Sequence, residues 1–219
     1  MTVIKLILIA VISYLLGSLN FGVILSKFVK KDDVREKGSG NAGTTNMMRS
    51  YGKIFGILTI IGDIAKVIIA IEIAFRILPA DELKKIFDLL NTNPQICLKS
   101  FAGLFAVIGH IFPCFFGFKG GKGVATSGGM VIFVNWKIAL ILFTVFVINF
   151  FTTKYVSLGS IIMAVLYPIM MWFFYKDLLL VVISCIFTLI VIIAHRENIK
   201  KLINGTENKI SFDKKNTSV

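Results

Sequence analysis

The sequence has 219 residues, of which 56% are hydrophobic, 16% are charged and 20 are phenylalanine. A soluble domain carries about a quarter of charged residues, so the composition excludes an ordinary soluble domain and indicates an all-α, polytopic membrane protein. The formal net charge is +12, but the basic residues lie in short segments between apolar runs. That pattern favours membrane topology, anionic lipid headgroups and an anionic substrate over a nucleic acid. The three cysteines are widely spaced and form no CxxC motif, so we expect no metal, and nothing indicates an organic cofactor.

Residues 3–25 form the first apolar run. At about 1.5 Å per residue, a helix of this length crosses the roughly 30 Å hydrocarbon core of a bilayer. Near its end stands Gly17-Ser18-Leu19-Asn20-Phe21-Gly22, where small residues let another helix approach closely. We predict a packing contact at this point.

Residues 27–53 form a polar segment with seven lysines and arginines. Within it, residues 38–46 are only Gly, Ala, Ser, Thr and Asn, and Arg35 and Arg49 stand on either side. A flexible linker has a similar composition, but two asparagines and three hydroxyl side chains between arginines suit a phosphate or a polyol. We favour the binding role. The candidate substrate-binding residues are Asn41, Thr45, Asn46 and Arg49, with Ser39 beside them.

The next two apolar runs are residues 54–78 and 100–116, and a polar connection, residues 79–99, joins them. Asp63 and Lys66 lie three residues apart, on one helix face, so we predict that they pair. Ionisable groups at membrane depth are functional candidates, but an ion pair that only locks helix packing is equally consistent with the sequence. His110, near the end of the third run, is expected to be a structural hydrogen-bond partner.

A glycine-rich loop follows the third run, with the sequence Gly117-Phe118-Lys119-Gly120-Gly121-Lys122-Gly123. Glycines allow backbone N–H groups to approach an anion, and a helix that begins just after the loop adds the positive end of its dipole. The loop lacks the GxxxxGK[ST] spacing of a nucleotide-binding P-loop. We therefore predict a site for a different phosphate, formed by Gly120, Gly121, Lys122, Gly123 and Thr126.

The remaining apolar runs are residues 124–151, 155–174 and 178–194, and a basic tail follows. Lysine and arginine favour the cytoplasmic side, so the segment 27–53 and the tail should lie on the same side. One span over residues 124–151 would put these two basic segments on opposite sides of the membrane. A break at 135–137 adds a crossing and returns both segments to the same side. We predict two short helices, residues 124–134 and 138–151, about 16 and 21 Å long, which need protein or a polar cavity beside them.

The predicted architecture is one domain, residues 1–219, with seven membrane helices, two of them short. The N-terminus is expected outside and the basic tail, residues 195–219, in the cytoplasm. This arrangement brings the segment 38–49, the glycine-rich loop, the tail, and Ser157 with Ser160 to one membrane face.

Three motifs stand in order along the chain. They are Gly38-Ser39-Gly40-Asn41-x-Gly43-x-Thr45-Asn46 with Arg49, Gly109-His110 with residues 118–126, and His195-Arg196-x-Asn198-Ile199 with Gly205-Thr206-Glu207. With these motifs the chain resembles, over nearly its whole length, the bacterial acyl-phosphate:glycerol-3-phosphate acyltransferases of the PlsY family. The resemblance implies transfer of a fatty acyl group from acyl phosphate to the 1-hydroxyl of glycerol 3-phosphate, giving lysophosphatidic acid and phosphate. It also implies a bacterial cytoplasmic (inner) membrane enzyme whose active site faces the cytoplasm, and we expect a monomer.

The resemblance implies roles for individual residues as well. Those at the polar substrate site are Ser39, Arg49 and Lys122; those of the acyl-phosphate loop are Gly120, Gly121 and Gly123; those near the reacting carbonyl are Ser160, His195 and Asn198. The expected catalytic set is Ser39, Lys122, Ser160, His195 and Asn198. His195 either accepts the hydroxyl proton or orients its neighbours, and the resemblance favours a substrate phosphate as the acceptor.

The chain departs from common family residues at Asn20, Thr44 and Val67, which concerns local packing more than chemistry. A transporter of an organic phosphate is the alternative function, because short helices and a basic mouth also occur in carriers. The two halves of the sequence, however, show no matching pair of glycine-interrupted helices.

Overall fold

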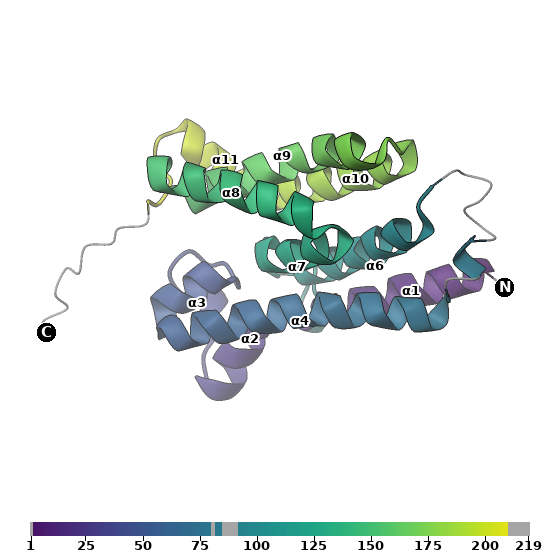
Figure 1. Ribbon diagram of the computed structural model, residues 1–219. Helices are drawn as coiled ribbons and strands as arrows, with labels where there is room; N and C mark the ends of the chain where they lie inside the picture. Colours follow the sequence, from purple (N-terminus) through teal and green to yellow (C-terminus); the bar gives the residue numbers. More distant parts are fainter. Residues whose placement is uncertain (1, 80–81, 85–91, 210–219) are drawn as a thin grey trace, which may run out of the picture.

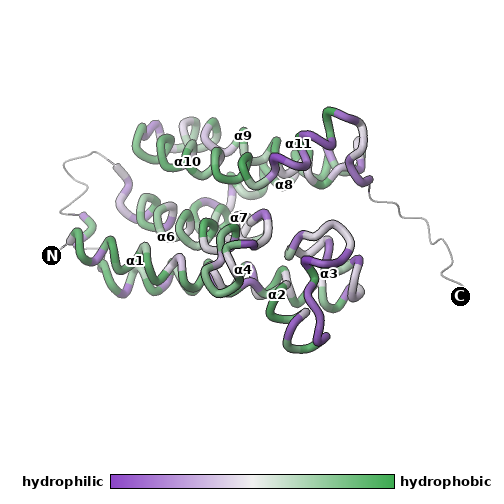
Figure 2. Tube along the Cα trace, turned by 180° about the vertical axis from the view of Figure 1, so that it is seen from behind, coloured by the Kyte–Doolittle hydropathy of each residue, from purple (hydrophilic) through white to green (hydrophobic). Residues whose placement is uncertain are grey.

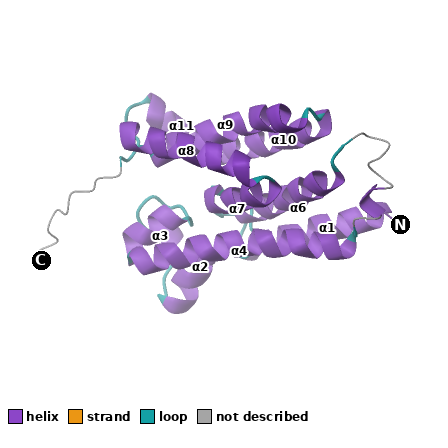
Figure 3. Cartoon of the chain, in the orientation of Figure 1, coloured by secondary structure: helices purple, strands orange, loops and turns teal. Residues whose placement is uncertain are grey.

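The computed structural model describes residues 2–79, 82–84 and 92–209, and every regular element in these ranges is a helix (Figure 3). The apolar helices are α1 (Thr2–Ser18), α4 (Lys53–Ile77), α6 (Pro94–Ile111), α7 (Val124–Val134), α8 (Trp136–Thr153), α9 (Val156–Tyr175) and α10 (Leu178–Ala194). The shorter elements are α2 (Phe21–Ile24), a π-helical turn (Leu25–Val29), two 3₁₀ turns (Val34–Glu36 and Cys114–Phe116), α3 (Thr44–Tyr51) and α11 (Arg196–Ile203). The predicted all-α fold is confirmed. Much of the polar connection 79–99 and the last ten residues of the tail lie outside the described residues.

The helices form three layers (Figure 1). Helices α1 and α4 make one outer layer, α6 and α7 the middle layer, and α8, α9 and α10 the other outer layer. Contacts of α6 with α1, α4 and α10, and of α7 with α4 and α8, join the layers. The buried core between them includes Val67, Ile71, Val107, Met130 and Leu180.

Within the described residues, five helical segments are long and apolar enough to cross a membrane. They are Thr2–Val29, Lys53–Ile77, Pro94–Phe116, Trp136–Thr153 and Val156–Tyr175. A sixth is reached if α10 and α11, which meet at a bend of 62°, are taken as one span, and α7 is a shorter apolar helix. The third span begins six residues earlier than predicted, because the Asn93 side chain accepts the N–H of Ile96 and Pro94 stands in the first turn.

The predicted break between α7 and α8 is confirmed, and Asn135 causes it. Its backbone is extended, and its Oδ1 accepts the N–H groups of Lys137, at 2.9 Å, and Ile138, at 3.4 Å. This cap starts α8 at Trp136 and the helix continues to Thr153, so it has 18 residues and is about 27 Å long, not the 14 residues predicted. Of the two membrane helices predicted to be short, α7, with 11 residues, is short and α8 is not.

Small residues near the end of the first span pack closely against neighbouring backbone, as predicted. A Cβ at Gly17 would overlap the carbonyl of Ala106 in α6, and one at Gly22 would overlap the carbonyl of Ala42. Between these two contacts the helix is interrupted, and the Asn20 side chain accepts the N–H of Val23 to start α2.

Polar residues gather at the end of the molecule that carries α2, α3 and α11 (Figure 2). Helix α1 starts at the opposite end (Figure 1). The fold therefore brings segments far apart in sequence to one polar end.

Candidate functional site

A cavity of about 1120 Å³ lies where these polar segments meet. Each of the four predicted polar clusters contributes to its lining: the segment 38–49, the glycine-rich loop, the start of α9 and the turn between α10 and α11. The predicted site residues that line it are Ser39, Asn41, Thr45, Asn46, Arg49, Gly120, Gly121, Lys122, Gly123, Ser160, His195 and Asn198. Thr126 does not line it; its side chain is fully buried in α7.

Asn46 shapes the segment that carries Ser39. Its Oδ1 accepts the N–H of Ser39 at 2.9 Å, and its Nδ2 donates to the carbonyl oxygens of Val34, at 3.1 Å, and Lys37, at 2.9 Å. The side chain is 1% exposed, and these bonds use both ends of its amide. Asn46, predicted to bind substrate, therefore holds the loop in place, while Ser39 and Arg49 are exposed beside the cavity.

Arg35 joins this segment to the glycine-rich loop, a contact that sequence reasoning missed. Its Nη1 donates to the carbonyl oxygens of Phe116, at 2.8 Å, and Lys119, at 3.0 Å. Its Nη2 lies 2.7 Å from Oδ2 of Asp33, which it pairs with. Hydrogen bonds from Arg35 hold the pKa of Asp33 well below its usual range, although partial burial opposes the shift. The guanidinium thus clamps the loop from the side of the first motif.

The N–H groups of Gly120 and Gly121 are already engaged by the protein. Gly120 donates to the carbonyl of Ile111 at 3.1 Å, and Gly121 donates to that of His110 at 3.2 Å, which satisfies the last carbonyls of α6. A Cβ at Gly120 would overlap the His110 carbonyl, and one at Gly121 would overlap the imidazole Nε2. These two glycines serve close packing, so their own N–H groups do not have the role in anion binding that the sequence suggested.

The groups of the loop that suit an anion are instead in its last residues and in the helix that follows. Gly123, in the left-handed region with a φ of +76°, precedes α7, and the first N–H groups of an α-helix have no acceptor within the helix. Val124 and Ala125 of this first turn line the cavity beside Lys122. An ammonium group next to a helix N-terminus suits a phosphate.

Lys122 is half-buried in this wall. Burial lowers the pKa of Lys122 from its ordinary value of 10.5, and the charge of Lys201 adds to this effect. The carboxylate of Glu207 opposes the shift. The cationic form of Lys122 is thus lost at a lower pH than that of an exposed lysine.

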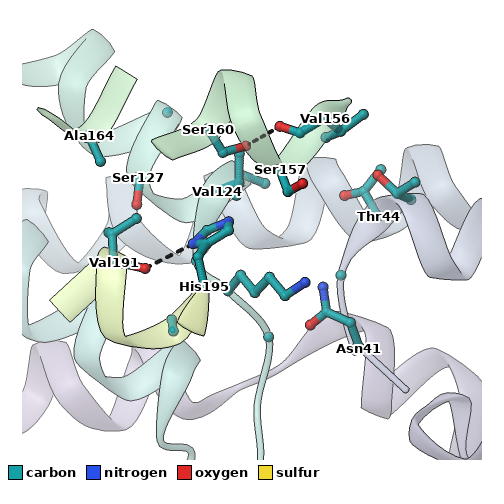
Figure 4. Close-up of a pocket in the computed structure, with 18 of the residues that line it drawn as sticks. Asn41, Thr44, Val124, Ser127, Val156, Ser157, Ser160, Ala164, Val191 and His195 are labelled. Carbon is teal, nitrogen blue, oxygen red and sulfur yellow. Dashed lines mark hydrogen bonds between the residues drawn. The ribbon is translucent and has the colours of Figure 1, made fainter. Parts of the chain in front are cut away.

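The adjoining part of the wall consists of α9 and the turn after α10, and Asn41 and Thr44 lie across from it (Figure 4). The Nδ1 of His195 lies 2.8 Å from the carbonyl of Val191, so Nδ1 carries the proton and Nε2 is the acceptor of the neutral ring. Ser160 donates its hydroxyl to the carbonyl of Val156 at 2.9 Å. Figure 4 shows both bonds on the wall that Asn41 and Thr44 face.

Glu207 ties the tail to this wall. Its Oε1 accepts the hydroxyl of Ser157 at 3.0 Å and the Nδ2 of Asn198 at 2.9 Å. The two bonds fix Asn198 against α9. In the sequence, Glu207 stands out only as part of a motif, since no local pattern reveals a partner 50 residues away.

The predicted pair of Asp63 and Lys66 is confirmed, and His110 joins it. The Nζ of Lys66 lies 2.9 Å from Oδ1 of Asp63 and 2.8 Å from Nδ1 of His110. Both members of the ion pair are at most 2% exposed. His110 is a structural hydrogen-bond partner here, as expected, and it also lines the cavity.

From the polar clusters the cavity extends along an apolar wall of α4, α7 and α8. Its lining residues there are Ile60, Ile64, Ile132, Trp136, Ala139, Leu140, Phe143 and Phe146. Several of them also face outward, because Ile132, Leu140 and Phe143 are 50%, 57% and 61% exposed. A cavity with a cationic end and an exposed apolar side suits an amphiphile with an anionic headgroup.

Comparisons with known proteins agree with this reading. The family model described as glycerol-3-phosphate acyltransferase matches residues 7–205. The chain is 40% identical over 205 residues to the glycerol-3-phosphate acyltransferase of Bacillus subtilis (strain 168), covering 94% of this chain and 97% of that protein. It is 41% identical over 202 residues to the one of Fusobacterium nucleatum, covering 92% and 96%.

Solved structures are also similar. One is a crystal structure of PlsY, described as an integral membrane glycerol 3-phosphate acyltransferase, in its glycerol 3-phosphate form. It is 35% identical to this chain with a TM-score of 0.80, and the match covers 94% of this chain and 96% of that one. The lysophosphatidic acid form of PlsY has a TM-score of 0.77 at 34% identity, with coverage of 94% and 95%.

Proposed function

This chain belongs to the glycerol-3-phosphate acyltransferase family, and on that premise we propose that it transfers a fatty acyl group from acyl phosphate to the 1-hydroxyl of glycerol 3-phosphate. The products are lysophosphatidic acid and inorganic phosphate. One observation carries the proposal: a single cavity joins the cationic end at Lys122 to an exposed apolar wall. The forms of the related structures, with glycerol 3-phosphate and with lysophosphatidic acid, name the same acceptor and product.

The proposed reaction is a direct acyl transfer. The hydroxyl oxygen of glycerol 3-phosphate forms a bond to the acyl carbonyl carbon, and the bond from that carbon to the phosphate oxygen breaks. Phosphate leaves, and the hydroxyl proton passes to an acceptor. Acyl phosphate is a mixed anhydride with a good leaving group, so the protein mainly has to position the reactants and stabilise charge. No covalent acyl-enzyme is required.

Lys122 and the first N–H groups of α7 hold the leaving phosphate in this proposal. Support comes from their adjacency at the cavity wall and from the preference of helix N-termini for anions. Gly120 and Gly121 contribute by close packing, which fixes the position of the next residue, Lys122.

Arg49 binds the phosphate of glycerol 3-phosphate. Its exposed guanidinium lines the cavity, and arginine can bind a phosphate through two parallel hydrogen bonds, which lysine cannot. Ser39, Asn41 and Thr45, which line the same cavity, bind the glycerol hydroxyls in this proposal.

The wall of Ser160, His195 and Asn198 lies beside the reacting carbonyl in the proposal. His195 presents Nε2 as an acceptor, because its Nδ1 proton is bound to Val191. We assign it the orientation of the attacking hydroxyl, and a substrate phosphate takes the proton. Asn198 is held for this purpose by Glu207.

The same proposal includes the topology. Seven membrane helices, with the N-terminus outside and the site facing the cytoplasm, account for the basic residues around the polar end. In this proposal a single domain, residues 1–219, acts as a monomer in the bacterial cytoplasmic membrane.

The test uses purified protein in detergent. Phosphate should be released from acyl phosphate only when glycerol 3-phosphate is present, which a transporter cannot do. Release without the acceptor, or acyl transfer from an acyl thioester but not from acyl phosphate, would contradict the proposal.

A further inference from the structure

The buried polar cluster of Asp63, Lys66 and His110 has no part in the proposed reaction, yet it touches three elements. Besides Asp63 and His110, the ammonium of Lys66 lies 3.2 Å from the carbonyl oxygen of Leu19. That carbonyl lies at the interruption between α1 and α2. The cluster therefore joins the broken first span, α4 and the end of α6.

The chemistry of Lys66 fixes the state of His110. An ammonium group has three protons and no lone pair, and here three acceptors lie around it: Leu19, Asp63 and His110. The Nδ1 of His110 must accept, so its proton is on Nε2. Burying such a charge is costly unless every proton finds a partner, which selects one arrangement of the three elements.

His110 connects the cluster to the glycine-rich loop. Its carbonyl accepts the N–H of Gly121 at 3.2 Å. Its imidazole also lies where a Cβ of Gly121 would be, so ring and glycine are in direct contact. The next residue is Lys122. The chain of contacts from Lys66 through His110 to Gly121 thus ends at the proposed phosphate-binding ammonium.

We propose that Lys66, with Asp63 as its counter-ion, is a positioning residue: by orienting His110 it sets the place of Gly121 and hence of the Lys122 ammonium. The inference rests on the proposed function for its kinetic consequence, but not for its structural one. A cluster that only pins helices together would affect stability and leave Lys122 where it is.

The double variant Asp63→Asn with Lys66→Met separates the two roles. Lys66→Met alone would leave the Asp63 carboxylate buried without a cation and could prevent folding. Changing both residues removes both charges, so the thermal midpoint in detergent should be close to that of the wild type. Thr59→Val is the matched control, because it removes a buried hydrogen bond of the same helix, to Phe55, without touching the cluster.

A second pair, Asp63→Asn with Lys66→Gln, restores a donor. The amide Nε2 of glutamine can donate to Nδ1 of His110, whereas methionine cannot. If the cluster only packs helices, the methionine pair should be closer to the wild type, because the site is buried and apolar. If Lys66 positions His110, the glutamine pair should be closer to the wild type.

Two measurements decide the matter. For the methionine pair we expect kcat/KM at least about tenfold lower, and hydrogen exchange of residues 119–123 at least about tenfold faster. The glutamine pair should recover both, and Thr59→Val should change neither. A stable methionine pair with wild-type exchange and kcat/KM within about twofold would overturn the inference.

If the methionine pair does not fold, the glutamine pair decides alone, and fast loop exchange in that pair contradicts the inference. Absence of turnover in the wild type would refute the proposed function instead. In that case the exchange of residues 119–123 still decides whether Lys66 positions the loop.

Discussion

The Nη1 of Arg35 lies 2.8 Å from the carbonyl oxygen of Phe116, so that a residue of the first motif holds the loop of the second. Its other carbonyl partner, Lys119, stands on the far side of the left-handed residues Gly117 and Phe118. One guanidinium therefore fixes both ends of the turn that leads to Lys122.

Arg35→Lys should lower kcat/KM by about tenfold or more, because an ammonium group cannot reach both carbonyls and Asp33 with the fork geometry of arginine. Steady-state kinetics with purified protein measures this. Lys27→Met is the control: Lys27 also pairs with Asp33, at 3.3 Å, but from a more exposed position. Equal losses of kcat/KM in the two variants would mean that the positive charge near Asp33 matters and the hydrogen bonds from Arg35 to the loop carbonyls do not.

The pH dependence of kcat/KM should have an alkaline limb set by Lys122. Burial lowers its pKa from the ordinary value of 10.5, and rising pH removes the proton and the charge, so activity falls below the pH at which an exposed lysine titrates. Lys201→Gln removes a neighbouring cation that adds to the lowering. This variant should therefore move the limb to higher pH.

Lys122→Arg supplies the check on that assignment. A guanidinium stays protonated throughout the accessible range, so the variant should be slower than the wild type but should lack the alkaline limb. A limb that persists unchanged in Lys122→Arg would assign the titration to another group.

The cap at Asn135 should matter for stability more than for activity. Asn135→Ala removes the cap of α8 and the hydrogen bond from Nδ2 to Tyr175, at 2.9 Å. Loss of a cap costs about 1–2 kcal/mol, which lowers the thermal midpoint by about 2–8 °C for a chain of this size. Thr144→Ala, which removes only an exposed bond to Leu140, should leave the midpoint nearly unchanged. Equal thermal midpoints for the two variants would contradict the stabilising role of Asn135 as the cap of α8.

The apolar wall should set the preference for acyl chain length. Ala139 lines the cavity, so a larger side chain there should exclude part of a long acyl chain. Ala139→Phe should lower kcat/KM for a long acyl phosphate by about tenfold or more relative to a short one, because the lost apolar contacts are worth about 1–3 kcal/mol. Ile141→Phe adds a ring to the same helix away from the cavity, and the ratio should not change. A changed ratio in Ile141→Phe alone would place the acyl chain elsewhere.

Much of the fold was predictable because its signals are local. The break at residues 135–137 was predicted because it puts the two basic segments on the same side of the membrane. Asn135 supplies the cap that makes the break. The start of α6 was also signalled by Asn93 and Pro94, but the prediction placed it at residue 100, where the apolar run becomes continuous. Helix α8 was predicted too short at both ends, because Trp136 and Lys137 were assigned to the break and the polar residues Thr152 and Thr153 to the next connection.

The site was less predictable where its contacts are distant in sequence. The spacing of Asp63 and Lys66 revealed their pairing, but nothing local showed that His110 completes it or that Gly121 packs on His110. The engagement of the Gly120 and Gly121 N–H groups depends on where α6 ends, which only the folded chain determines.

The central claim is most directly tested by the stoichiometry of products. Wild-type protein in detergent, given acyl phosphate and isotope-labelled glycerol 3-phosphate, should form labelled lysophosphatidic acid and phosphate in equal amounts, and Lys122→Ala should reduce both by about a hundredfold or more. Phosphate without lysophosphatidic acid, or full activity of Lys122→Ala, would contradict the account.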